Sequence, residues 1–179
     1  MLNIVLYATD LLQVDEAHSS YLLAGLSLGI GVGSFIAGYA SGRKIEMGII
    51  LPGLAGIVLL LGVLSVPGLS YEEVLLFLGV LGVCAGFFVV PVNALIQNRP
   101  RPEVKGRVLG ASNLLSFGGI ALQPVVQYAM LRLGHPDAAR VFLIYAGACF
   151  VMAVVLARML PELWPSALYW TRLRQRTSL

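Results

Sequence analysis

Five long stretches without a single Asp, Glu, Lys or Arg dominate this chain and restrict what it can fold into. Four of them exceed the roughly 20 residues that a helix needs to cross the hydrocarbon core of a membrane, and the fifth reaches the lower limit of about 17. A soluble domain of 179 residues could not bury so much apolar surface. The sequence therefore predicts an all-α integral membrane protein with five complete transmembrane helices. These spans are Ala17–Gly42, Met47–Tyr71, Val74–Asn98, Val108–Leu131 and Val141–Ala157.

The basic residues between these stretches predict how the chain sits in the membrane, because Lys and Arg are retained in loops on the cytoplasmic side. Arg132 and Arg140 share one connector, whereas the other ten basic residues lie in alternate connectors or after the last span. This alternation predicts a cytoplasmic C-terminus and places Met1–Leu12 at the outer end of a partial helix that rises from the cytoplasm. The ten are Arg43, Lys44, Arg99, Arg101, Lys105, Arg107, Arg158, Arg172, Arg174 and Arg176.

The composition supports a membrane protein and argues against other classes. Hydrophobic residues make up 58% of the chain and charged residues only 12%, against about a quarter charged in soluble proteins. The isoelectric point of about 9.1 does not indicate nucleic-acid binding, because the excess basic residues lie at predicted cytoplasmic helix ends. Anionic lipid of the cytoplasmic leaflet is the expected partner of these residues.

No residue cluster indicates an enzyme, a metal site or a cofactor. His18 and His135 fall in predicted outer connectors without a second histidine or a carboxylate cluster nearby. Cys84 and Cys149 fall in the middle of spans and lack metal-ligand spacing. The five stretches also lack a deep acidic or basic residue, so they offer no carboxylate for a proton relay.

A stripe of small residues runs along one face of the first complete span. Its members recur every four residues, which places them on one side of a helix and lets another helix approach closely. The stripe predicts either a static packing seam or a surface along which helices slide or rock, and the sequence leaves both open. Its members are Gly25, Gly29, Gly33, Ala37 and Ser41.

Amide side chains in two of the spans are the candidates for a substrate path. Burying an unpaired amide in hydrocarbon costs several kcal/mol, so each needs a hydrogen-bond partner or a wet cavity. Pro91 and Pro124 lie beside these amides and predict that both helices are broken. Hydrogen bonding between helices and contact with a substrate satisfy an amide equally well, so both stay open. The amides are Asn93, Gln97, Asn113, Gln123 and Gln127.

The loop Gly38-Tyr-Ala-Ser-Gly-Arg-Lys44 resembles the loop motif of the major facilitator superfamily, in which glycine, an acid and a basic residue follow a glycine-striped helix. Gly42 takes the place of the acid, and Ile45-Glu46 replaces the later Gly-Arg pair. Gly48, Pro52-Gly53 and the segments Pro91–Gln97 and Lys105–Asn113 extend the match. Together they look like the second half of the lysophospholipid transporter branch.

This resemblance implies a fold of twelve helices, of which the chain would hold the end of the seventh and all of the eighth to twelfth. Residues 1–160 would form a half transporter, and the aromatic and basic residues 161–179 a cytoplasmic interfacial tail. Members of the branch move lysophospholipids from the outer to the inner leaflet of the bacterial inner membrane for reacylation. A first six-helix half and an acyltransferase are the partners that the resemblance implies.

Arg43 and Lys44 would hold the cytoplasmic gate of such a transporter, or would only fix its orientation in the membrane. Two other functions remain open at this point. One is a carrier of the same superfamily for a drug or a small amphiphile. The other is a non-transporting membrane anchor that partners a lipid acyltransferase.

Overall fold

The computed structural model describes residues 2–10, 12, 15–41, 47–134 and 138–159. Within these ranges all regular structure is helical. Arg43, Lys44 and the tail 161–179 lie outside the described residues, so their roles stay predictions. The helices are α1 (Leu2–Asp10), α2 (Glu16–Ser41), the short 3₁₀ helix η1 (Met47–Ile49), α3 (Ile50–Leu64), α4 (Tyr71–Asn98), α5 (Pro102–Gly134) and α6 (Ala138–Met159).

In the part of the chain that the structure describes, four helices are long and apolar enough to cross a membrane, namely α2, α4, α5 and α6. The expected second span falls short, because α3 has only 15 residues. It ends at Leu64, and the chain then turns through Pro67 and Gly68, whose φ of +93° suits glycine. The expected number of five complete spans therefore stays a prediction.

Helix α4 begins three residues before the charge-free stretch from which it was predicted, because a capping box fixes its start. The Ser70 hydroxyl accepts a hydrogen bond from the Glu73 backbone N–H at 3.4 Å. The Ser70 backbone N–H in turn donates to the Glu73 carboxylate at 2.8 Å. These two bonds satisfy N–H groups that a helix start otherwise leaves unpaired.

The predicted breaks at the two prolines are wrong, because α4 continues through Pro91 and α5 through Pro124. A proline inside a helix removes one hydrogen bond and crowds the preceding turn. The neighbouring turns of a long apolar helix can keep it continuous around such a loss. Pro91 itself is fully buried.

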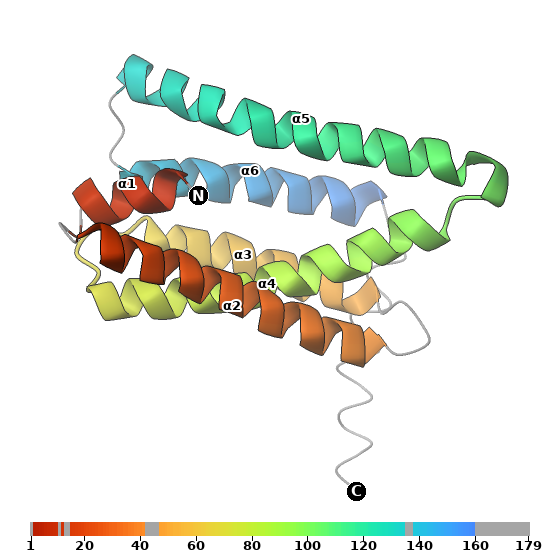
Figure 1. Ribbon diagram of the computed structural model, residues 1–179, viewed down its shortest axis with the longest axis horizontal. Coiled ribbons are helices and arrows are strands. Elements are labelled where there is room, and N and C mark those ends of the chain that lie inside the picture. The colour runs from red at the N-terminus through yellow and green to blue at the C-terminus, as the bar shows by residue number, and fades with distance from the viewer. Residues whose placement is uncertain (1, 11, 13–14, 42–46, 135–137, 160–179) are drawn as a thin grey trace, which may run out of the picture.

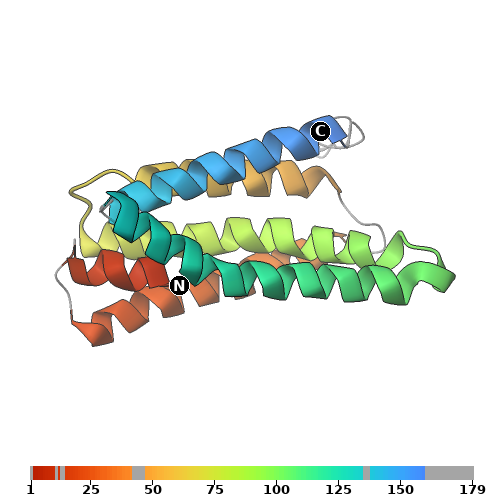
Figure 2. The ribbon, with the colours of Figure 1, turned by 90° about the horizontal axis from the view of Figure 1, so that it is seen from above.

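The helices form a bundle around one apolar core, with α5 to one side. Helix α2 packs along α4, while α3 lies between α4 and α6, as Figures 1 and 2 show from two directions. Buried residues from five helices make the core, among them Tyr7 of α1 and Phe142 of α6, whose rings meet edge to face with centroids 5.4 Å apart. Helix α5 contributes none of these core residues.

Candidate functional site

The small-residue stripe of α2 lies directly against α4. A Cβ atom added at Gly29 would overlap the backbone of Gly79, and one added at Gly33 would overlap the backbone of Val83. On the facing side, a Cβ atom at Gly82 would overlap the Leu26 carbonyl of α2. Glycines on both helices therefore let the two backbones touch, which is the closest approach that helices in a membrane can make.

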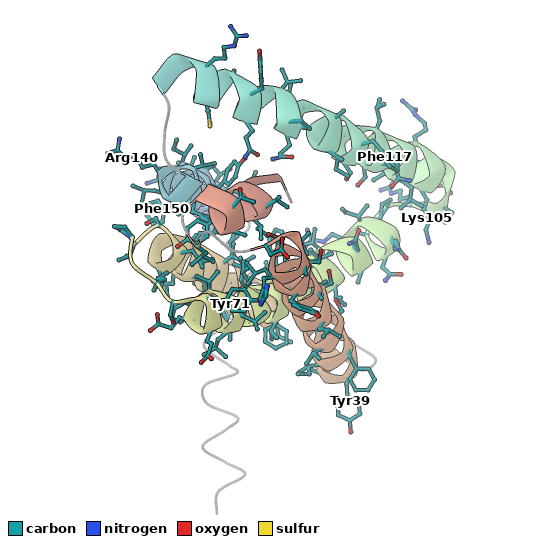
Figure 3. All side chains as sticks on the ribbon, turned by 60° about the vertical axis from the view of Figure 1, so that its left-hand side comes forward. Tyr39, Tyr71, Lys105, Phe117, Arg140 and Phe150 are labelled. Atoms are coloured by element: carbon teal, nitrogen blue, oxygen red, sulfur yellow. The ribbon has the colours of Figure 1, made fainter. Side chains whose placement is uncertain are left out.

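The seam is looser toward the start of α2 and remains closed toward its end. A Cβ atom at Gly25 would meet the flexible Leu75 side chain at 2.8 Å, whereas Ala37 is fully buried. Gly38, the first residue of the loop motif, is exposed and would have open space around a Cβ atom. Tyr39 beside it points away from the bundle (Figure 3).

Two of the predicted path amides lie exposed on α4, close to its C-terminal end. Asn93 donates its side-chain N–H to the Val89 carbonyl at 3.0 Å, within the same helix. Gln97 follows four residues later and is also exposed, so the two share one helix face.

The other amides are on α5, and two of them join α6 in a polar cluster. Gln123 donates to the side-chain oxygen of Gln127 at 2.8 Å and to the Tyr145 hydroxyl of α6 at 3.3 Å. Gln127 is fully buried. Asn113 is exposed and precedes Gln123 by ten residues, which is about 15 Å along α5 at 1.5 Å per residue. We call Gln123, Gln127 and Tyr145 the amide–tyrosine cluster.

Four of the five amides therefore form two groups that lie far apart along the chain of helices, and Asn113 lies between them on α5. Asn93 and Gln97 lie in the last turns of α4, before the chain passes into α5, while Gln123 and Gln127 lie in the second half of α5. A path along α4 and α5 would pass both groups in turn. A single compact binding site made of all five is excluded by this separation.

The site residues that the sequence predicts do not include Tyr145. They also do not include a second group, the aromatic residues His18, Tyr21 and Tyr71. His18 lies in the first turns of α2 and not in a connector. Its ring lies 5.4 Å from the Tyr71 ring and 6.1 Å from the Tyr21 ring, both edge to face. The Tyr71 hydroxyl also donates to the His18 carbonyl at 3.1 Å, which ties α2 to α4.

The sequence indicates only some of the contacts within these two groups. His18 and Tyr21 are three residues apart and so share a helix face, but nothing local indicates that Tyr71 packs against them. Tyr145 is a polar aromatic residue inside a charge-free stretch, and the hydroxyl of a buried tyrosine usually finds a hydrogen-bond partner. Among the described residues no group of His, Cys, Asp or Glu is placed to hold a metal ion.

Comparison with known proteins decides the family. The sequence model of the Major Facilitator Superfamily matches residues 1–169. The chain belongs to this superfamily. The membrane-spanning helices of this major facilitator chain agree with that membership.

Individual relatives of this superfamily chain are lysophospholipid transporters named LplT. The protein of Escherichia coli O157:H7 (strain EC4115 / EHEC) is 32% identical over 128 residues, which cover 68% of this chain and 30% of the relative. The protein of Escherichia coli O9:H4 (strain HS) is 36% identical over 128 residues, which again cover 68% of this chain and 30% of the relative. The protein of Shigella flexneri serotype 5b (strain 8401) is 32% identical, over 68% of this chain and 31% of the relative.

The aligned part of the chain thus spans about 30% of the length of these curated relatives. No solved structure gives a significant match.

Proposed function

We propose that this chain forms the second six-helix half of a transporter that moves lysophospholipid across a bacterial inner membrane. Membership of the Major Facilitator Superfamily and likeness to three proteins named lysophospholipid transporter support this proposal. A first six-helix half completes the carrier, since such folds hold their substrate between two halves and alternate access by rocking one against the other.

The observation that carries the proposal is the amide–tyrosine cluster, which joins α5 to α6 in the part of α5 that lies between the charged residues at its start and Arg132 in its last turn. A lysophospholipid has a polar headgroup and one apolar chain, so its path needs hydrogen-bonding groups set within an apolar wall. Gln123 and Tyr145, which are both half-buried, supply such groups, and the buried Gln127 accepts from Gln123 and holds it in place. Leu114, Leu115 and Phe117 of α5, each at least 69% exposed, supply apolar surface.

The packing of the bundle suggests which parts move together. Helices α2 and α4 are joined backbone to backbone at the glycine seam, so we expect them to rock as one rigid unit. Helix α5 makes few contacts with its neighbours and is the wall that can adjust to a substrate. Asn93, Gln97 and Asn113 are then reached by the headgroup at a different stage from the amide–tyrosine cluster. Arg43 and Lys44 would close the cytoplasmic side.

Uptake of fluorescent lysophosphatidylethanolamine into the protected leaflet of liposomes tests this proposal. The chain is reconstituted alone and together with a co-expressed first half. We expect protection of the lipid only when both halves are present. Absence of protection in both cases, with insertion of the chain verified, would contradict a lysophospholipid carrier.

A matched pair of tyrosine variants tests the role of the cluster. Tyr145→Phe removes the hydroxyl that accepts from Gln123, whereas Tyr128→Phe removes one that accepts from Arg132, also on α5. A hydrogen bond between membrane helices is worth about 0.6 kcal/mol on average and at most about 1.7. We therefore expect about a threefold, and at most about a twentyfold, lower uptake rate for Tyr145→Phe and little change for Tyr128→Phe.

The same assay separates the other functions that the sequence left open. Uptake of a fluorescent drug without uptake of lysophospholipid would indicate another carrier of the superfamily. Co-purification of an acyltransferase without any uptake would indicate a membrane anchor.

A further inference from the structure

A cavity of about 320 Å³ lies at the end of the bundle where α4 passes into α5. Four helices supply its apolar wall: Ile50 comes from α3, Val92 and Ile96 from α4, Val108 from α5 and Leu156 from α6. Its volume falls within the roughly 300–1,000 Å³ of known ligand pockets. The cavity is distinct from the amide–tyrosine cluster, which lies toward the opposite end of α5.

Among the described residues that line this cavity, Arg99 is the charged one, and Pro100 of the α4–α5 connector lies beside it. Further cations follow at the same end of the bundle, with Arg101 in the connector before α5, Lys105 in the first turn of α5 and Arg158 in the last turn of α6. Figure 3 shows Lys105 at this end of α5. Glu103 is the acidic residue in the first turn of α5. The mouth of the cavity is therefore positively charged and its wall is apolar.

We propose that this cavity binds an anionic phospholipid of the adjacent leaflet. The phosphate pairs with Arg99, whose guanidinium matches the geometry of a phosphate group, and part of an acyl chain fills the space between Val92, Val108 and Leu156. Basic pockets between membrane helices on the cytoplasmic side are known to bind such headgroups. The alternation of basic residues along the chain predicts that this end is cytoplasmic.

Such a lipid would also join α5 to the rest of the bundle. Residues of α3, α4, α5 and α6 line the cavity, and α5 contributes nothing to the described apolar core. An acyl chain between these helices adds dispersion contacts where protein side chains leave a space. The inference does not depend on which substrate the protein carries.

Native mass spectrometry of the purified full chain tests the proposal, with phosphatidylglycerol or phosphatidylcholine added to the detergent at equal concentration. We expect one phosphatidylglycerol to be retained and phosphatidylcholine to be lost. Equal retention of both lipids would overturn the proposal, because it would show that charge plays no part.

Two variants separate the cavity from the general positive charge of this end. Arg99→Gln should lower retention of phosphatidylglycerol about fivefold, as expected for one basic residue at the membrane surface. Arg101→Gln removes an equal charge from an exposed position that is not part of the cavity lining, and should have less than half this effect. Equal losses in the two variants would overturn the proposal.

Val108→Phe tests the cavity itself without a change of charge. Val108 is 37% exposed at the rim, so the larger ring can enter the cavity without disturbing the core of the bundle. We expect retention of phosphatidylglycerol to fall at least as much as in Arg99→Gln, with the helix content by circular dichroism unchanged. Unchanged retention in Val108→Phe would show that the lipid binds elsewhere.

Discussion

At Gly33 the hydrogen atom in place of a side chain lets the backbone of α2 reach the backbone of Val83 in α4. Gly31, two residues earlier in the same helix, has open space where a Cβ atom would be. The two positions differ only in what faces them, so they form a matched pair for a test of the seam.

We predict that Gly33→Ala destabilises the protein and that Gly31→Ala does not. Forcing a methyl group into close-packed backbone costs about 1–3 kcal/mol, whereas alanine in an open helical position is favoured over glycine by up to about 1 kcal/mol. Thermal unfolding in detergent, followed by circular dichroism, measures the difference. An equal melting temperature for the two variants would show that the seam does not hold α2 against α4.

Residue types at helical spacing predicted the stripe of α2, because small residues every four positions mark one face of a helix. The surroundings of the amides could not be predicted in the same way. The partner of Gln123 is Tyr145, 22 residues away on another helix, and no local pattern links them. Asn93 instead bonds within its own helix, which a sequence cannot distinguish from a contact with a substrate.

At the scale of the helices, charge-free stretches predicted where α2 and α6 lie to within three residues, whereas α5 begins six residues before its stretch. They also missed the end of α3 and the start of α4, because local chemistry decides those boundaries. Pro67 and Gly68 end the apolar run of α3 early, and the capping box at Ser70 starts α4 before its apolar part. The predicted breaks at the two prolines were wrong. A proline in a sequence shows that one backbone hydrogen bond is lost, but it does not show whether the surrounding structure compensates for that loss and keeps the helix continuous.

Replacement of Ser70 tests how far the capping box sets the start of α4. Ser70→Ala removes the hydroxyl that accepts from Glu73, and such a loss costs about 1 kcal/mol. We expect a melting temperature about 2–4 °C lower for a chain of this length. Ser27→Ala is the control, since the Ser27 hydroxyl only bonds the Leu23 carbonyl one turn back in α2. A loss of similar size in both variants would contradict a special role of the cap.

At the scale of the whole molecule, the orientation predicted from the basic residues can be tested by labelling. Val66 and Arg101 are both exposed and lie in connectors at opposite ends of α4. In a chain whose Cys84 and Cys149 are replaced by serine, we expect Val66→Cys to react with an impermeant maleimide in intact cells. Arg101→Cys should react only after the membrane is opened. The reverse pattern would place the C-terminus outside.

The glycine seam also has a consequence for the synthesis of the protein and its insertion into the membrane. Helix α2 is complete at Ser41, but its partner α4 begins only at Tyr71, so α3 emerges from the ribosome between the two. Helices in membranes insert first and pair afterwards. The stripe of α2 therefore faces lipid until most of α4 has been translated. A nascent chain halted before that point exposes a surface built for close pairing to whatever other helix the insertion machinery holds.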